Sequence, residues 1–434
     1  MSQRSQESSL TMSNSLDKIS LFEEMSLADV YESEAKSRVS DDTYEGREEA
    51  ISNERIRINE DILGTYVVTS EAISGGMGSV WRVHHRGWNI DLAMKRPQPA
   101  FFAEGSEKRK KAFVQECENW IRLVLHPCVV SCYYVREIGG VPTIFSEWME
   151  NGSIRDRIRD DSLYLGTVRE VQARILDIAI QSARGLQYSH EHGLLHQDVK
   201  PGNILLGDGW TAKVADFGLA SVARDSEDPS DTAGNGANDS GRSTATSGFD
   251  ANKSRIISGY TVQYCPKEQT EGAEAGAWMD VYAWALTVLE MFCGERPWET
   301  GAQAKEMLED PELFEECRIP VPPAMQELLI RCIQNSGGGA SNAGDAAPEE
   351  EEGSETPSND ALHDFGPVIP ELEKIYKEIT DKKYARLSYS LKAETPDLLN
   401  NYALSYLDLK RSDVAKFLWD GALRLDPNHA EGSG

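Results

Sequence analysis

Two neighbouring stretches of this chain concentrate polar residues that can carry chemistry: His196-Gln197-Asp198-Val199-Lys200-Pro201-Gly202-Asn203 and, eighteen residues after its aspartate, Asp216-Phe217-Gly218. Upstream lie the glycine turn Gly75-Gly76-Met77-Gly78 and, seventeen residues beyond it, Lys95. A glycine-lined turn lets backbone N–H groups approach a phosphate, and the Lys95 ammonium group could reach the same phosphate. Glycine hairpins and solvated lysines are each common, so the prediction of phosphate chemistry rests on all four features occurring in this order.

The predicted elements indicate two lobes. Residues 63–68, 79–83 and 90–95 have the β-branched and aromatic composition of strands, and residues 107–125 have apolar side chains at helical spacing. Further strands are predicted at 129–135 and 143–148, and long helices at 169–190 and 277–292. A strand-rich first third followed by a helix-rich remainder predicts an α+β fold with two lobes.

The glycine turn, the strand Ala93-Met94-Lys95 and the two stretches together resemble the motifs of eukaryotic-type (Hanks-type) serine/threonine protein kinases. Their counterparts there are the glycine loop, the Ala-x-Lys strand, the HRDxKxxN catalytic loop and the DFG motif. The resemblance covers about residues 65–334, with a last helix near 368–379, and the glycine loop is similar to that of bacterial-type members. It implies the two-lobed kinase fold, ATP and Mg²⁺ as cofactors, and protein substrates.

The resemblance also implies roles for single residues. Asp198 would accept the proton of the substrate hydroxyl, and Lys200 would offset charge on the transferred group. Asn203 and Asp216 would supply oxygen ligands to Mg²⁺. The residues expected to surround the nucleotide are Ile73, Gly75, Gly76, Gly78, Val80, Ala93, Lys95, Glu116, Glu147 and Met149.

Within that set, Lys95 would hold the α- and β-phosphates, steadied by a glutamate of the following helix. Glu116 is the first choice; Glu118 is the alternative, although a solvated helix face suits Glu118 better. Val80 and Ala93 would enclose the adenine, and Glu147-Trp148-Met149 would be the hinge between the lobes.

The acceptor and the support of the catalytic loop also follow from the resemblance. Lys200, two residues after Asp198, and Thr261, seven before Glu268, are what serine/threonine kinases carry, so Thr261 is expected in the substrate-docking segment. Asp280 matches the aspartate that braces the catalytic loop from beneath.

Four positions depart from the family pattern. Ile73 replaces the first glycine of the loop, and Gln197 replaces the arginine of HRD. Ala-Pro-Glu becomes Pro266-Lys267-Glu268, and no arginine that could pair with this glutamate occurs between Arg331 and Arg386. The last two departures weaken the expected anchoring of the docking segment, but no residue with a direct chemical role is lost.

Composition limits the partners and the compartment. The chain has 72 acidic and 44 basic residues, a net charge of −28, which repels nucleic acid and anionic membranes. The seven cysteines form no CxxC pair and are expected to be reduced thiols. No apolar run is long enough to span a membrane and no signal pattern is seen at the start, so a cytoplasmic location is expected.

The chain is expected to divide into six parts. These are a disordered acidic Ser-rich tail (1–60), the N-lobe (61–148), the C-lobe (149–334) with an activation-segment insertion (221–258), an acidic low-complexity insertion (335–363), a helical linker with the last kinase helix (364–395), and a tetratricopeptide-like repeat (396–429).

The repeat is predicted from small and aromatic residues at its characteristic spacing: Leu399, Tyr402, Ala403, Tyr406, Ala415, Trp419, Ala422 and Pro427. The bland alternative is an ordinary amphipathic helix pair. One repeat cannot bury its own face, so the helices are expected to leave Tyr406 and Trp419 only partly covered and to offer a surface to a protein partner.

The sequence leaves two other functions open. A pseudokinase scaffold would bind partners through the lobe surface and the repeat; the intact Lys95, Asp198, Asn203 and Asp216 argue against it, while Ile73 and the missing arginine favour it. Phosphate transfer to a small molecule is disfavoured by Thr261 in the docking segment.

Overall fold

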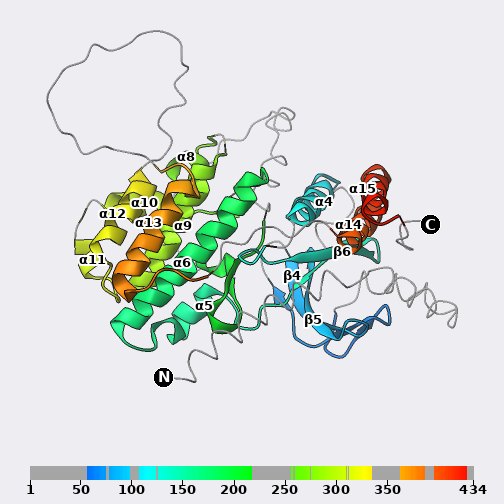
Figure 1. The fold of residues 1–434 in the computed structure, drawn as a ribbon, viewed down its shortest axis with the longest axis horizontal. Coiled ribbons are helices and arrows are strands. Elements are labelled where there is room, and N and C mark those ends of the chain that lie inside the picture. The colour runs from blue at the N-terminus through cyan, green and yellow to red at the C-terminus, as the bar shows by residue number, and fades with distance from the viewer. Residues whose placement is uncertain are drawn as a thin grey trace, which may run out of the picture.

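The computed structural model describes residues 56–74, 78–97, 107–123, 126–217, 256–257, 260–273, 275–308, 310, 312–334, 362–386 and 395–427. In Figure 1 they form a strand-rich N-lobe and a helical C-lobe, so the predicted two-lobed α+β fold is confirmed. The predicted disordered tail up to residue 55, Gly75, Gly76, Gly218 and most of both predicted insertions lie outside the described residues.

The N-lobe is an antiparallel sheet of seven short strands: β1 (Asp61–Ile62), β2 (Tyr66–Val68), β3 (Ile73–Ser74), β4 (Gly78–His85), β5 (Ile90–Pro97), β6 (Cys132–Ile138) and β7 (Val141–Glu147). The hydrogen-bonded order is β1-β2-β4-β5-β7-β6, with β3 paired to β4, so β6 forms one edge. The β6–β7 hairpin turns at Gly139 and Gly140, whose φ angles of 59° and 75° suit glycine because it has no Cβ.

Helix α4 (Glu107–Arg122) matches the helix predicted at 107–125. Its buried side is formed by Phe113, Cys117, Trp120 and Ile121, as the apolar spacing predicted. The Trp120 indole Nε1 donates a hydrogen bond to the carbonyl oxygen of Val130 at 3.0 Å. This bond ties the helix to the segment that leads into β6.

The C-lobe is built around helix α9 (Ala277–Cys293), which is apolar and buried along most of its length. The other C-lobe elements are α5 (Ile154–Arg159), α6 (Val168–Glu191), α8 (Lys267–Thr270), α10 (Gly301–Met307), α11 (Glu312–Glu315), α12 (Pro323–Gln334), α13 (Phe365–Thr380), and the hairpins β8 (Ile204–Leu206) with β9 (Ala212–Val214) and β10 (Ile256–Ile257) with β11 (Tyr260–Thr261). Helix α6 begins with a capping box between Thr167 and Glu170, which fixes its first turn. The long helices predicted at 169–190 and 277–292 are confirmed as α6 and α9.

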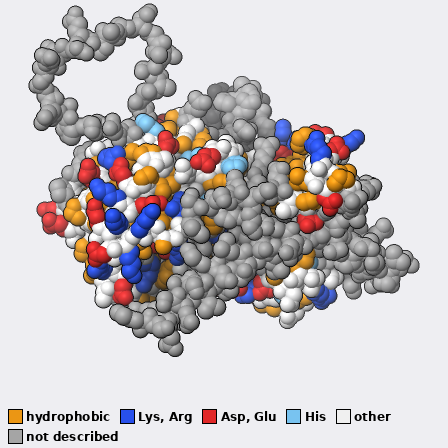
Figure 2. Space-filling view, in the orientation of Figure 1, with side chains coloured by type: hydrophobic (Ala, Val, Ile, Leu, Met, Phe, Trp, Pro, Cys, Tyr) orange, Lys and Arg blue, Asp and Glu red, His pale blue; other side chains and the backbone are white. Residues whose placement is uncertain are grey.

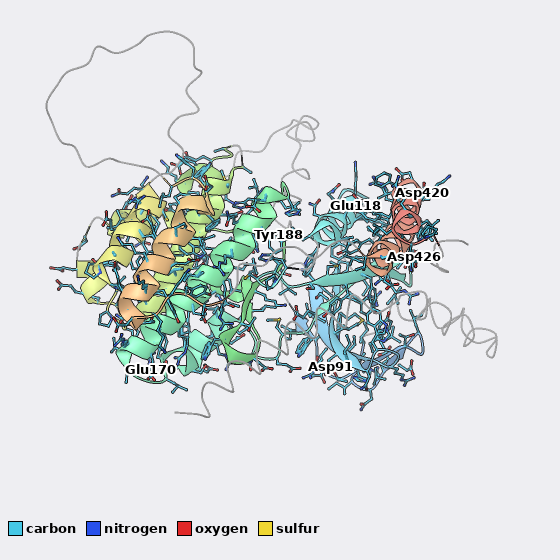
Figure 3. All side chains as sticks on the ribbon, in the orientation of Figure 1. Asp91, Glu118, Glu170, Tyr188, Asp420 and Asp426 are labelled. Carbon is cyan, nitrogen blue, oxygen red and sulfur yellow. The ribbon has the colours of Figure 1, made fainter. Side chains whose placement is uncertain are left out.

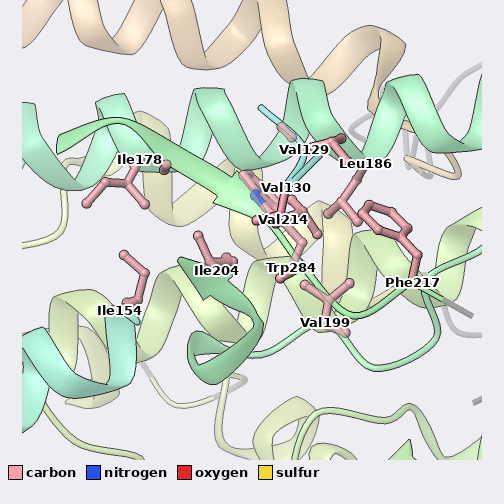
Figure 4. Close-up of a cluster of buried hydrophobic side chains, with 14 of the residues drawn as sticks. Val129, Val130, Ile154, Ile178, Leu186, Val199, Ile204, Val214, Phe217 and Trp284 are labelled. Atoms are coloured by element: carbon pink, nitrogen blue, oxygen red, sulfur yellow. The ribbon is translucent and has the colours of Figure 1, made fainter. Parts of the chain in front are cut away.

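A compact apolar cluster supports the two stretches at 196–203 and 216–217 (Figure 4). Leu186 of α6, Val214 of β9 and Trp284 of α9 are fully buried. Val199 and Phe217, at 1% and 0% exposure, belong to the same cluster. Because each directly follows an aspartate of the predicted site, the core fixes where those aspartates lie.

Helix α13 matches the last helix predicted near 368–379 and packs against α6. The chain after it is held by Arg386, whose guanidinium Nε and Nη2 donate to the Asp177 carboxylate at 2.9 and 2.8 Å. Arg386 therefore does not pair with Glu268. Within the described part of the chain, the buried Oε2 of Glu268 has no hydrogen-bond partner, in agreement with the missing arginine.

The C-terminal segment forms two helices, α14 (Pro396–Asp408) and α15 (Ser412–Leu425), which pack against each other. They do not stand apart from the lobes, because α14 packs along β6 of the N-lobe (Figure 1). Tyr406 is consequently 6% exposed. The expectation of partial cover is therefore wrong for Tyr406, because α14 lies on the N-lobe sheet, whereas Trp419 of α15 is only partly buried, as expected.

In the view of Figure 2, Lys and Arg side chains on the surface of the described C-lobe are interspersed with Asp and Glu side chains.

Among the described residues, no helix has both the length and the apolar character that a membrane crossing requires.

Candidate active site

The register of β4 and β5 gathers several of the predicted nucleotide-contacting residues. Val80 lies opposite Lys95, and Arg82 lies opposite Ala93. Because side chains alternate along a strand, Gly78, Val80, Ala93 and Lys95 share one face of the sheet. These residues form a small, partly apolar surface beside the ammonium group of Lys95, a residue that is 6% exposed.

The glycine turn is only partly described. Gly75 and Gly76 lie outside the described residues, and Ile73, in β3 before the turn, is 64% exposed. Gly78 lies so close to β5 that an added Cβ would be 2.3 Å from the carbonyl oxygen of Arg96. Only glycine therefore allows β4 and β5 to approach at this point.

Lys95 joins the N-lobe sheet to Asp216. Its Nζ donates to Asp216 Oδ1 at 2.9 Å, across 121 residues of sequence. The same Nζ lies 5.9 Å from the centre of the Trp120 ring of α4. Burial raises the pKa of Asp216, but the charge and hydrogen bond of Lys95 outweigh it, so the pKa lies below its usual value. Asp216 is thus held as a carboxylate.

Asp198 is the most heavily bonded side chain of the catalytic-loop stretch. Thr261 donates to its Oδ1 from the backbone N at 3.1 Å and from Oγ1 at 2.7 Å. Its Oδ2 accepts from the Lys200 ammonium group and from Asn203 Nδ2, the latter at 3.2 Å. Lys200 Nζ also donates to Thr261 Oγ1 at 2.8 Å. The three residues predicted for the base, the charge and the docking segment therefore meet at one point.

The backbone of this loop is held by Asp280 at the start of α9, as the resemblance implied. Its Oδ2 accepts from the backbone N of His196 at 2.8 Å, and its Oδ1 accepts from that of Gln197 at 2.7 Å. His190 Nε2 lies 2.8 Å from Oδ2. Burial raises the pKa of Asp280, but these hydrogen bonds and nearby charges hold it below the usual value.

The catalytic-loop stretch and the Asp216 stretch are joined directly. His196 Nε2 donates to the carbonyl oxygen of Ala215 at 2.8 Å, and Ala215 N donates to that of Asn203 at 2.9 Å. Gln197 and Asp216 both have left-handed backbone conformations, with φ of 60° and 63°. Non-glycine residues adopt this conformation at an energetic cost, and such residues cluster at functional sites.

The segment between the lobes contains an interaction that sequence reasoning missed. Lys213 Nζ of β9 lies 2.6 Å from Glu147 Oε2 at the end of β7, and both side chains are buried. Met149, two residues further, is also buried. The sequence feature that could have indicated this ion pair is a lysine within the short, otherwise apolar strand β9.

The oxygen atoms offered to a metal ion fit Mg²⁺. Asn203 uses its Nδ2 on the main-chain and side-chain oxygens of Asp198. Within the described residues, its Oδ1 and the Oδ2 of Asp216 accept no hydrogen bond. One amide and one carboxylate oxygen are hard ligands, and Mg²⁺ bound with phosphates usually takes only one or two ligands from the protein.

The glutamates of α4 give a mixed result. The side chain of Glu116, the first choice as partner of Lys95, lies outside the described part of the chain. Glu118 is 3% exposed and its Oε1 accepts from Arg411 Nη1 at 2.6 Å. The expectation of a solvated face at Glu118 is therefore wrong, because the C-terminal helices cover it.

The family model described as "Protein kinase domain" matches residues 66–337, more than half of the chain. The chain is 25% identical to serine/threonine-protein kinase PknB of Mycolicibacterium smegmatis over 273 residues, which are 60% of this chain and 38% of that protein. It is 28% identical to PknB of Mycobacterium leprae over 233 residues, 51% of this chain and 31% of the relative. The chain thus spans well under half the length of these curated relatives.

Among solved structures, the kinase domain of Mycobacterium tuberculosis PknI is matched with a TM-score of 0.47 and 21% identity, over 74% of this chain and 99% of that one.

Proposed function

Because this chain belongs to the protein kinase family, we propose that it transfers the γ-phosphate of ATP to serine and threonine hydroxyls of protein substrates. The observation that carries the proposal is the position of Asp198, which accepts a hydrogen bond from a threonine hydroxyl while Lys200 contacts both groups.

In the proposed reaction, Asp198 orients the attacking hydroxyl and takes its proton. This role is supported by Thr261, whose Oγ1 is a hydroxyl that donates to Asp198 Oδ1 at 2.7 Å. Lys200, bound to both side chains, supplies positive charge where the transferred group gains negative charge. Thr261 belongs to the segment that would receive the substrate.

The nucleotide is proposed to lie between the lobes, on the sheet face that carries Gly78, Val80, Ala93 and Lys95. Gly75, Gly76 and Ile73 would complete the phosphate loop, and Glu116 would steady Lys95. The segment from Glu147 to Met149 would meet the adenine edge. Mg²⁺, held by Asn203 and Asp216, would neutralise the charge of the phosphates when bound.

The proposed partners are protein substrates, without nucleic acid or membrane. A protein partner at the C-terminal helix pair is proposed for α15 alone, because α14 packs on β6, whereas Phe417 and Leu425 of α15 are 68% and 53% exposed. A cytoplasmic location is also part of the proposal, and the free thiols of the seven cysteines agree with a reducing compartment.

The test is transfer of labelled phosphate from ATP to a generic Ser/Thr peptide. Asp198→Asn and Asp216→Asn should each lower the rate by about 10²-fold or more, while circular dichroism and the melting temperature stay close to wild type. Asp420→Asn, on the exposed side of α15 (Figure 3), is the matched control. Phosphoamino-acid analysis should give phosphoserine and phosphothreonine. Wild-type rates in Asp198→Asn would reject the assignment, and no transfer by the wild type would favour the scaffold alternative.

A further inference from the structure

The outer edge of the N-lobe sheet is closed by side chains of helix α14. Strand β6 is an edge strand, so part of its backbone N–H groups point away from the sheet. Val135 N donates to Ser405 Oγ and Glu137 N donates to Asp408 Oδ2, each at 3.2 Å. The helix therefore accepts hydrogen bonds that a partner strand would otherwise accept.

Charged groups extend this contact along the same edge. Arg136, 3% exposed, has its Nε 3.8 Å from Asp408 Oδ2. Lys410 Nζ lies 3.3 Å from Glu137 Oε1. Ser405 itself is fully buried. The interface between α14 and β6 is therefore defined by specific polar contacts as well as by apolar packing.

The turn between α14 and α15 reaches helix α4. Lys410 has a left-handed backbone (φ 62°), and Arg411 N donates to the carbonyl oxygen of Tyr406 at 2.8 Å, which fixes the turn. From there Arg411 Nη1 donates to Glu118 Oε1 at 2.6 Å. The Glu118 side chain is 4% exposed, and a buried carboxylate needs such a partner.

Helix α4 is consequently held on two sides. Through Trp120 it is bonded to Val130 O and lies beside Lys95. Through Glu118 it is bonded to the turn of the C-terminal helix pair. In Figures 1 and 3, α4 lies next to α14 and α15, with Glu118 on the side toward them.

We propose that Arg411 is a positioning residue of the active site: acting through Glu118, it holds α4 in the place where Trp120 borders Lys95. The C-terminal helix pair, residues 395–427, is then a built-in clamp on the N-lobe. This inference rests on the proposed function, because its consequence is a better-placed Lys95 for the phosphates of ATP.

The inference is tested in the full chain with Arg411→Gln, Glu118→Gln and the double variant. Arg411→Lys keeps the charge, and Lys416→Gln changes an exposed lysine of α15 as a matched control. Three quantities are measured: KM for ATP, KM for the peptide, and hydrogen exchange of residues 107–122 compared with α6.

Each neutralising variant should raise KM for ATP about 5-fold or more, leave KM for the peptide unchanged, and accelerate exchange in α4 but not in α6. The double variant should be no worse than the worse single one, since both remove the same contact. Arg411→Lys and Lys416→Gln should behave as wild type.

Unchanged exchange in α4, or an unchanged KM for ATP, in Arg411→Gln would overturn the inference. If the wild type does not phosphorylate the peptide, the proposed function fails, whereas the exchange comparison still decides whether Arg411 holds α4.

Discussion

Lys213 and Glu147 form a buried ion pair, with Nζ 2.6 Å from Oε2, that joins the strand leading to Asp216 with the segment between the two lobes. The two residues are 66 positions apart in the chain. Their pairing couples the base of the candidate metal site to the candidate hinge.

Lys213→Met should destabilise the protein by about 3–5 kcal/mol, because it leaves the Glu147 carboxylate buried without its partner. The double variant Lys213→Met/Glu147→Leu should recover most of this loss. Urea denaturation measures both, with Lys416→Met as the exposed control. A loss below about 1 kcal/mol in the single variant would mean that water reaches the pair.

Asp280→Asn should lower kcat by about 10²-fold, since the amide presents a donor to one of the two backbone N–H groups of His196 and Gln197 and so displaces Asp198. Exchange of the amides at 196–198 should accelerate at the same time. Asp420→Asn is the control for loss of one carboxylate. A normal kcat together with accelerated exchange would contradict the prediction, because the loop would then have lost rigidity without loss of catalysis.

The stability of the N-lobe and its neighbourhood should fall as pH drops below neutrality. Burial lowers the pKa of His85 to about 4 and that of His126 to about 3. The unfolded chain, with an ordinary histidine pKa near 6.5, binds protons first, so stability is lost as pH falls from about 6.5 toward these values.

Each histidine should contribute a slope of up to about 1.4 kcal/mol per pH unit over that range. His85→Asn and His126→Asn keep an acceptor for the backbone N–H groups of Trp88 and Cys128, and should flatten the slope. Denaturation at several pH values measures it. An unchanged slope in both variants would contradict the assignment.

Activity should depend little on phosphates in the segment 221–258. In kinases with HRD the arginine pairs with such a phosphate, whereas Gln197 is neutral and cannot form a charge-assisted pair. Gln197 is buried, and its main-chain carbonyl oxygen accepts a hydrogen bond from Gln269 Nε2 at 3.3 Å. Phosphatase treatment should therefore spare most of the peptide phosphorylation. If phosphatase treatment abolished activity, and deletion of the segment did the same, another group of the protein would have to bind the phosphate.

The order of the site residues along the chain, and the elements that carry them, could be predicted from local sequence patterns. Asp198, Lys200, Asn203 and Asp216 lie within nineteen consecutive positions. Helices α6 and α13 have apolar residues at helical spacing, and α9 is a nearly continuous apolar run. Such signals are local, because backbone propensity and side-chain periodicity act over a few turns of chain.

The contacts between distant segments could not be predicted from such local patterns. Glu118 is bonded to Arg411 across 293 residues, and Val135 to Ser405 across 270. No local sequence pattern predicts either pair. A glutamate on an amphipathic helix is expected to be solvated, because its sequence neighbours do not show that another element covers it. Burial depends on what the remaining chain brings against a surface, and for this reason the C-terminal helices read as a free repeat in sequence and lie on the N-lobe in the folded protein.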